Sequence, residues 1–272
     1  MALRLVVCVT LAVLALASAR DAAAATLDPF SSLVRPSRQS GDGKSRLQRF
    51  TAAPDDRNFL LETRRNAARI QFLCAPADPR IACQIDPDRP TEEIFDLSAE
   101  RGSRGDVLFR DSAGRLVVRV TPYGNATVYW PGEADGLAAT KRDDDAGRLR
   151  LPMVRYVDVP LRAARAERLL SERFGATVKF DLEEATIANE FRPSPVLADA
   201  IVRVAAGFEI VAGEERAAAA LKARPIRFRF VEGADPAAVG EPGEVTVTYR
   251  PRVGPEGRPG AASMADAIRA AI

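Results

Sequence analysis

Between residues 69 and 131 the sequence alternates short runs of apolar and polar residues. A period of two is typical of strands that are buried on one face. Glycine, proline, aspartate and serine interrupt the runs, and connections this short join neighbouring strands in antiparallel order. The pattern predicts an antiparallel meander of about six strands, which must curl into a small barrel or a sandwich to bury one face. The predicted strands are 69–74, 80–85, 93–96, 106–110, 115–121 and 126–130.

After residue 153 the apolar residues take on helical spacing. Pro160 and Gly175 stand where a helix is expected to begin and to end. Ser194 and Pro195 begin a second helix, which has a continuous apolar face. Further helices are predicted at 214–223 and 264–272, and strands at 176–182, 226–231 and 244–250. The predicted fold class is therefore α+β, with an N-terminal antiparallel β-meander followed by a mixed helix/strand C-terminal part.

Changes in composition divide the chain into six segments. The stretch before residue 57 is rich in Ser, Arg, Gly, Pro and Gln without a sustained period, which predicts a mobile arm. A short helix is predicted at 57–67, capped by Asp55 and Asp56. The segments are 1–19 (leader, with a second possible cut after 25), 26–56 (arm), 57–132 (β-rich domain), 133–152 (linker or long loop), 153–252 (α+β part) and 253–272 (tail with a short helix).

The first 19 residues have the features of a secretory signal peptide. Arg4 precedes an uncharged apolar run, and Ala17-Ser18-Ala19 is a small-x-small cleavage signature. The run is shorter than the stretch of about 18 apolar residues that a membrane anchor needs. We therefore expect an exported bacterial protein, periplasmic or secreted, with no transmembrane segment in the mature chain.

The composition excludes several classes of function. The chain has 272 residues, of which 47% are apolar, and it contains no histidine. It cannot carry a Ser-His-Asp or Cys-His relay, or a zinc ion bound by histidine. Thirty-nine basic and 37 acidic side chains give a net charge of +2, which argues against a nucleic-acid partner. We expect no cofactor and no catalytic residue of a familiar type.

Two cysteines, Cys74 and Cys83, are left once the leader has been removed. If a hairpin folds about Asp78 and Pro79, they are direct cross-strand neighbours, close enough for a disulfide. Two buried thiols, or a redox or metal pair, are the alternatives. The spacing is not Cys-x-x-Cys and no third soft ligand exists, so the sequence favours the disulfide and predicts no metal site.

Three short motifs stand out beside these patterns: Arg104–Asp111, Gly124–Tyr129 and Gly257–Gly260. Together they resemble an uncharacterised family of exported bacterial proteins that is defined only as a domain of unknown function. The resemblance covers most of the mature chain and implies export and a mixed fold. It supplies no activity and no site residue.

The candidate ligand-binding residues lie at two places. Tyr123 and Trp130 flank the turn of one predicted hairpin, where flat aromatic rings can stack on sugars or on a partner. An even-length loop would place Tyr129 in the core and Trp130 beside Arg119, on which it could stack. The other place is the strand 226–231, where Arg227 and Arg229 share one face and could grip an anionic partner. The alternative for the aromatic residues is ordinary core packing. The alternative for the two arginines is the solvent-exposed face of a sheet that is buried on one side only.

These observations leave three hypotheses about function. The first is a non-catalytic periplasmic module that binds or supports an envelope component, with no partner identified. The second is a histidine-free hydrolase that uses Asp181, Glu183 and Glu184 on an envelope polymer. The third is a peripheral membrane protein held by the helix at 264–272 and the basic arm. A deep pocket with carboxylates of raised pKa would favour the enzyme, and a shallow patch would favour the binding module.

Overall fold

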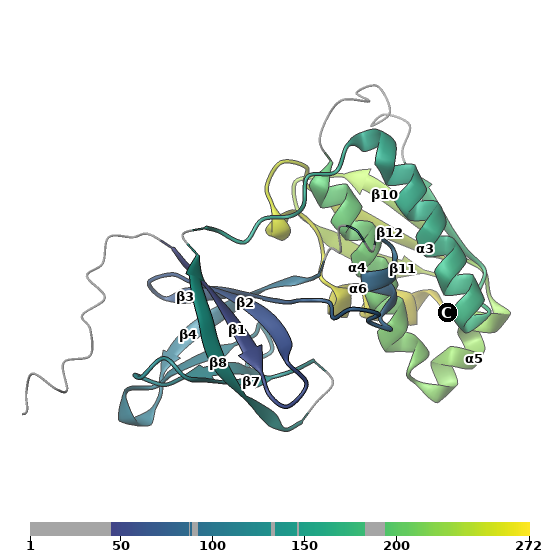
Figure 1. Ribbon diagram of the computed structural model, residues 1–272. Helices are drawn as coiled ribbons and strands as arrows, with labels where there is room; N and C mark the ends of the chain where they lie inside the picture. Colours follow the sequence, from purple (N-terminus) through teal and green to yellow (C-terminus); the bar gives the residue numbers. More distant parts are fainter. Residues whose placement is uncertain (1–44, 87, 89–91, 132–133, 146, 183–193) are drawn as a thin grey trace, which may run out of the picture. The chain divides into compact units, whose positions relative to one another are not determined.

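The computed structural model describes residues 45–86, 88, 92–131, 134–145, 147–182 and 194–272. Two architectures follow one another along these residues (Figure 1). Eight antiparallel strands form a closed barrel, and a four-stranded sheet with helices comes after it. This confirms the predicted α+β class, and of the two predicted arrangements of the meander it is the barrel that forms.

Each barrel strand pairs with the next one along the chain, and the first pairs with the eighth to close the sheet. Closure removes the exposed strand edges at which sheets aggregate. The strands are β1 (Arg46–Ala52), β2 (Arg57–Thr63), β3 (Ala67–Phe72), β4 (Ile94–Arg101), β5 (Val107–Arg110), β6 (Leu116–Val120), β7 (Ala126–Tyr129) and β8 (Gly136–Asp145).

Aromatic rings fill much of the barrel interior. Phe50 stacks on Phe59 with ring centroids 5.0 Å apart. Phe72 meets Trp130 edge to face at 4.6 Å. All four side chains are buried in one apolar cluster. An eight-stranded barrel is just wide enough for side chains to fill, and these rings supply the volume.

The C-terminal part is built on a sheet with the strand order β11-β12-β10-β9. The strands β9, β10 and β12 are parallel, and β11 is antiparallel to β12. Parallel neighbours need a crossover connection, which helices supply here. The elements are α3 (Val159–Phe174), β9 (Val178–Leu182), α4 (Pro195–Ala212), α5 (Glu215–Ala223), β10 (Ile226–Glu232), β11 (Ala237–Glu241), β12 (Glu244–Tyr249) and α6 (Ala261–Ala271).

Helix α4 is the centre of this part. Thirteen of its 18 residues are buried, which makes it a core helix and not a surface one. It packs against α3, α5 and α6. Helices α4 and α6 approach each other closely at Gly207. A Cβ added at this residue would stand 2.7 Å from the Cβ of Met264. Only glycine fits at that position without a shift of one helix.

A short helix, α2 (Ile81–Gln84), lies in the connection between β3 and β4. Ile81, Ala82 and Ile85 belong to the same core cluster as the buried side of α4. The β3–β4 connection therefore extends out of the barrel sheet and packs into the core of the helices.

The structure corrects three predictions about the first two strands and the last strand of the barrel. β1 lies in the stretch expected to be a mobile arm, β2 takes the place of the helix expected at 57–67, and β8 lies in the expected linker. A register shift between Arg49 and Phe50 explains the first error, because a bulge interrupts the period of two. In β2 the consecutive apolar residues Phe59, Leu60 and Leu61 conceal the alternation.

Two further predictions are wrong. Residues 81–84 form α2 and not a strand, and β11 lies in the stretch expected to be a loop between the last two strands. The other helices and strands expected in the C-terminal part are present. α3 ends as predicted at Gly175, which takes the left-handed conformation with a φ of 66°.

The last helix does not present an apolar face to solvent. Met264, Ala265 and Ile268 of α6 are at most 1% exposed, because they pack on α4 and the sheet. This removes the proposed membrane contact through 264–272. Among the described residues, no helix has the length and apolar character needed to cross a bilayer.

Candidate functional site

The predicted bridge between Cys74 and Cys83 is present, with an S–S distance of 1.97 Å and a Cα–Cα distance of 5.9 Å. The expected reason was wrong. Cys83 lies on α2 and is not the partner of Cys74 on an opposite strand. The bridge closes a loop of residues 74–83, which we call the disulfide loop.

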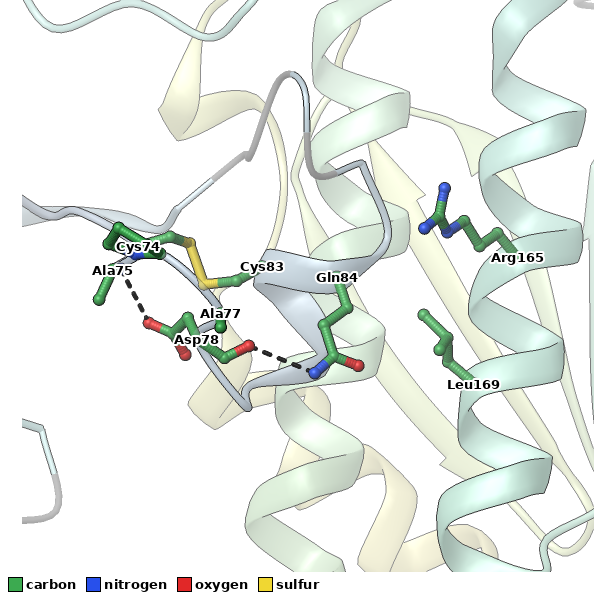
Figure 2. A pocket seen from close by; sticks show the side chains of 9 residues that line it. Cys74, Ala75, Ala77, Asp78, Cys83, Gln84, Arg165 and Leu169 are labelled. Carbon is green, nitrogen blue, oxygen red and sulfur yellow. Dashed lines mark hydrogen bonds between the residues drawn. A yellow bond between two sulfur atoms is a disulfide. The ribbon is translucent and has the colours of Figure 1, made fainter.

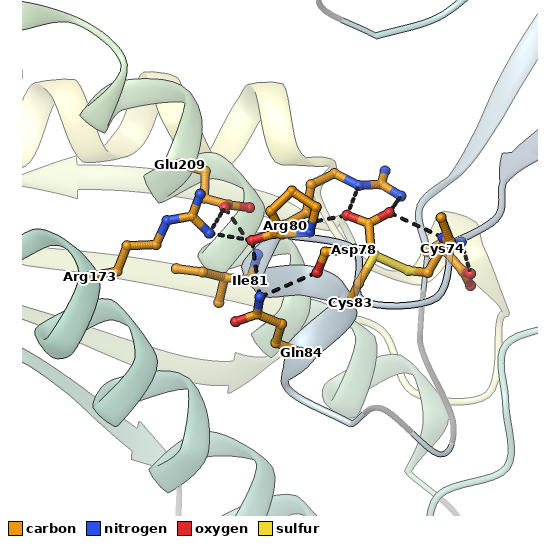
Figure 3. Close-up of polar contacts among 11 residues, drawn as sticks. Cys74, Asp78, Arg80, Ile81, Cys83, Gln84, Arg173 and Glu209 are labelled. Atoms are coloured by element: carbon orange, nitrogen blue, oxygen red, sulfur yellow. Dashed lines mark hydrogen bonds and ion pairs between the residues drawn. A yellow bond between two sulfur atoms is a disulfide. The ribbon is translucent and has the colours of Figure 1, made fainter. Parts of the chain in front are cut away.

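Asp78 organises the disulfide loop (Figure 3). Its carboxylate accepts hydrogen bonds from the backbone N–H groups of Ala75 and Arg80, and it forms an ion pair with the Arg80 guanidinium at 2.7 Å. Burial alone would raise the pKa of Asp78, but the hydrogen bonds and charge of Arg80 outweigh it and lower the pKa. Asp78 is therefore ionised over the whole physiological range.

Two carboxylates, the buried Glu92 and the half-buried Glu209, hold the disulfide loop near its ends. Glu92 accepts the backbone N–H of Cys74 at 2.7 Å. Glu209 of α4 accepts the backbone N–H of Ile81 at 3.0 Å and pairs with Arg173 at 3.2 Å (Figure 3). Desolvation by burial raises the pKa of both carboxyl groups. They are structural acceptors of the loop backbone, which accounts for their burial.

An open depression of about 600 Å³ lies between the disulfide loop and α3 (Figure 2). Its wall includes the disulfide, Asp78 and Gln84 on one side, and Arg165 and Leu169 of α3 on the other. Gln84 is held in place because its amide donates to two backbone carbonyl groups of the loop. The carboxylate in this depression has a lowered pKa, which is the opposite of what a general acid requires.

The second concentration of polar side chains is one face of the C-terminal sheet. Ile226, Phe228 and Phe230 of β10 are buried against the helices, while Arg227 and Arg229 point to the other side and are exposed. This confirms the predicted alternation on that strand. We call the exposed side the open face. Its residues are Lys179, Asp181, Arg227, Arg229, Val231, Ala237, Val239, Glu241, Glu244, Thr246 and Thr248.

The strand register arranges the open face in rows across the sheet. One row is charged and runs from Lys179 through Arg227 to Glu244 and Glu241. The next contains Asp181, Arg229, Thr246 and Val239, and the last contains Val231, Thr248 and Ala237. The face therefore grades from charged to small and weakly polar, and Val239 is 55% exposed on it.

The two arginines of the open face differ in their partners. Arg229 pairs with Glu244 at 3.3 Å and donates to the Thr246 hydroxyl at 3.3 Å. The Arg227 guanidinium has no hydrogen bond or ion pair to a residue that the structure describes, and only its backbone N–H has a partner, the Gly243 carbonyl. It lies in register between the like-charged Lys179 and Glu244, whose carboxylate pairs with Arg229. Like charges side by side on a sheet are destabilising, so Arg227 is a cation that an anionic ligand would satisfy.

The aromatic residues of the β6–β7 hairpin lie on the opposite faces from those predicted. Residues 122–124 form the loop, an odd number, and Val118 pairs with Val128. A shift of one residue exchanges the two faces of a strand. Trp130 is consequently buried, with 8% exposure, and Tyr129 is half-buried outside the core.

The predicted partners of Trp130 and Arg119 are corrected as well. The guanidinium over the Trp130 ring is that of Arg57, 4.9 Å from the centroid. Arg119 instead forms an ion pair with Asp106 at 2.5 Å. Of the hairpin candidates only Tyr123 is fully available to a ligand, at 92% exposure.

A buried ion cluster is the main feature that the sequence did not reveal. Asp199 and Arg203 are one helical turn apart on α4 and pair at 3.3 Å, and Arg258 pairs with Asp199 at 2.5 Å. Glu93 completes the cluster, 3.5 Å from Arg203. The side chains of Asp199, Arg203 and Arg258 are at most 5% exposed. Two opposite charges spaced by four within the apolar stretch 196–208 of α4 were the available signal.

The cluster also explains the Gly257–Gly260 motif. Glu93 accepts the backbone N–H of Ala261 at 3.0 Å, at the start of α6. A Cβ at Gly260 would stand 2.7 Å from the same carboxylate, and one at Gly257 would stand 2.4 Å from the Arg250 carbonyl oxygen. The motif is therefore a tight turn that places Arg258 in the core.

A family model for a domain of unknown function, DUF4908, matches residues 29–268. The chain belongs to this family. The DUF4908 match spans the barrel, the disulfide loop, the open face and the buried ion cluster, so all of them are parts of one family domain. No curated protein matches the chain, and no solved structure matches it either.

The carboxylates of the enzyme hypothesis are only partly placed. Asp181 lies exposed on β9, beside Arg229 of β10. Glu183 and Glu184 lie outside the described residues.

Proposed function

We propose that this chain is an exported periplasmic protein and a non-catalytic module that binds an anionic polymer of the cell envelope on the open face. The leader at 1–19 supports export. The observation that carries the binding proposal is the open face itself. It is a sheet surface that no helix among the described residues covers, and the guanidinium of its central cation, Arg227, has no partner among the same residues.

The chemistry of the open face fits an extended polar ligand. Its rows offer guanidinium donors, carboxylate acceptors and the hydroxyls of Thr246 and Thr248, over the width of four strands. Arg227 would bind a carboxylate or phosphate of the polymer, and such an exposed contact is screened by salt. Small side chains at the other end, Ala237 and Val239, leave room for a chain to lie flat.

Co-sedimentation tests this proposal. The purified protein is mixed with cell-wall sacculi, and separately with envelope membranes, at low and at high salt. We expect it to pellet with one of these fractions at low salt and to be released at high salt. If the protein stays in the supernatant with both fractions, the proposal is wrong.

A matched pair of variants locates the surface. Arg227→Gln should reduce the pelleted fraction several-fold, whereas Arg216→Gln, the same change on the exposed side of α5, should leave it unchanged. Equal effects of the two variants would show that binding reflects overall charge and not the open face.

The hydrolase alternative predicts a different result in the same co-sedimentation assay. A hydrolase would release soluble fragments from sacculi over time, and Asp181→Asn would stop the release if Asp181 is a catalytic carboxylate. Binding without release supports the non-catalytic module.

A further inference from the structure

The disulfide loop gathers three atoms that can bind a metal ion. The sulfur atoms of Cys74 and Cys83 and a carboxylate oxygen of Asp78 all lie within 4.8 Å of one another. The same three residues line the open depression beside α3 (Figure 2), so solvent reaches them from one side. The sequence contains no third soft ligand, and the fold of the loop brings a hard ligand, the Asp78 carboxylate, to the two sulfur atoms instead.

We propose that reduction of the Cys74–Cys83 bridge converts the disulfide loop into a Zn²⁺ site with Cys74, Cys83 and Asp78 as ligands. Zinc accepts thiolate and carboxylate ligands together and prefers four of them in tetrahedral order. Three come from the protein, and the fourth position, facing the depression, takes a water molecule. The site is closed to metal while the sulfur atoms are bonded to each other.

An external phosphine or dithiol supplies the two electrons that reduce the Cys74–Cys83 bond. With a phosphine, the S–S bond breaks, the phosphorus takes the oxygen of one water molecule, and the two hydrogens of that water end on the two sulfurs. Binding of Zn²⁺ then releases both thiol protons, because the thiolate is the ligand.

The charges of the reduced loop suit a divalent cation. Two thiolates and the Asp78 carboxylate carry three negative charges, and Arg80, paired with Asp78 at 2.7 Å, carries one positive charge. The remaining charge of minus two equals that of one Zn²⁺ in magnitude.

The loop is held in place by contacts that do not depend on the S–S bond. Glu92 binds the backbone of Cys74, Glu209 binds the backbone of Ile81, and Cys83 is on a helix packed in the core. Sulfur atoms on tetrahedral zinc are about 3.8 Å apart, given a Zn–S distance of about 2.3 Å. With Cα atoms 5.9 Å apart, rotation of the two side chains suffices to reach this spacing.

Cobalt(II) is the probe, because thiolate-bound Co²⁺ in tetrahedral order has intense charge-transfer and visible absorption bands. The experiment uses the full chain with Cys8→Ser, so that Cys74 and Cys83 are the only thiols. We expect no such bands from the oxidised protein, one equivalent of bound Co²⁺ after anaerobic phosphine reduction, and loss of the bands when Zn²⁺ is added. Absence of the bands in the reduced protein overturns the proposal.

Two variants test the ligand set. Asp78→Asn should weaken binding at least about tenfold, and its single amide oxygen can still accept one of the two loop N–H groups, that of Arg80. The matched control is Asp111→Asn, in a loop where the carboxylate likewise accepts two backbone N–H groups and pairs with an arginine, Arg115. The control should bind Co²⁺ as the parent does, with the same circular dichroism spectrum in all three proteins. Equal affinity of Asp78→Asn and the parent would overturn the role of Asp78.

Discussion

The barrel and the C-terminal part solve the problem of a buried core in different ways. In the barrel, neighbours in the chain are neighbours in the sheet, and stacked and edge-to-face aromatic rings fill much of the interior. In the C-terminal part, β10 lies between β9 and β12, and the core around α4 encloses charged groups. The aromatic interior of the barrel is held by the fit of its side chains, whereas the core around α4 also contains charges that must be paired.

The two parts nevertheless share contacts that should make them unfold together. Leu47 of β1 and Ile94 of β4 belong to the core cluster of the C-terminal part. Glu62 of β2 is fully buried and accepts the backbone N–H of Leu149 at 3.0 Å. The unfolding of each part can be followed by its own spectroscopic signal. The only tryptophan, Trp130, is in the barrel and reports on it by fluorescence, whereas the helices α3 to α6 lie outside the barrel and report by circular dichroism.

The largest effect is expected from Asp199→Ala. The variant leaves Arg258 and Arg203 buried with one carboxylate between them, and breaking such a buried pair costs about 3–5 kcal/mol. Urea unfolding followed by tryptophan fluorescence and by circular dichroism at 222 nm measures the loss. Both signals should move to lower urea by the same amount.

The control for this variant is Asp266→Ala, which removes an exposed ion pair of α6 with Arg269 and should cost at most about 1 kcal/mol. If Asp199→Ala moves the dichroism transition and leaves the fluorescence transition in place, the barrel is an independent folding unit. The two parts then do not unfold together. A cost below that of the control would show that the cluster is not needed for stability.

An intermediate effect is expected from Cys83→Ser. A disulfide that closes a loop this short stabilises by about 2–3 kcal/mol through the unfolded chain. Under oxidising conditions the variant should melt at a lower temperature than the parent. In the presence of reductant and a chelator the two should melt alike. Equal melting without reductant would show that the bridge contributes nothing.

The smallest effect is expected from Glu92→Gln, and it is a change in pH dependence. Burial raises the pKa of Glu92 in the folded protein above its ordinary value of 4.5, so the folded protein keeps this proton to higher pH than the unfolded chain does. The stability that this provides is present below about pH 4.5 and is lost as the pH rises through the raised pKa. Glutamine cannot ionise, so the melting temperature of the variant should fall less between acidic and neutral pH.

Glu214→Gln gives the opposite sign and serves as the comparison. A hydrogen bond from Arg269 lowers the pKa of Glu214, so its contribution is present above the ordinary pKa and is lost as the pH falls. Its removal should lower the melting temperature at neutral pH and not at acidic pH. Parallel pH profiles for both variants and the parent would contradict these assignments.

The sequence predicted more of the C-terminal helices than of the barrel ends. Pro160, Gly175 and Pro195 act locally, so the limits of α3 and α4 could be predicted without knowledge of the fold. β1 and β8 form because they pair with each other across the closed barrel, at a separation of about 90 residues, and no local pattern records such a contact.

The candidate site residues also divide into those that local sequence places and those that distant contacts place. Arg227 and Arg229 were placed on the correct side of the sheet because strand alternation decides it. Trp130 was placed on the wrong side because the length of one turn, and not the composition, sets the parity of β7. Asp78 and the buried ion cluster depend on contacts between distant segments, which one sequence cannot show.

The turn at Gly257–Gly260 bears on how an alignment of the family should be interpreted. Any side chain at 257 would collide with the Arg250 backbone carbonyl, and one at 260 would push the Glu93 carboxylate away from the Ala261 N–H. Arg258 has its counterion fixed inside α4. These columns are expected to be invariant for steric and charge reasons alone. Invariance there is no evidence of catalysis, and a search for functional divergence among homologues should weigh the variable columns of the open face instead.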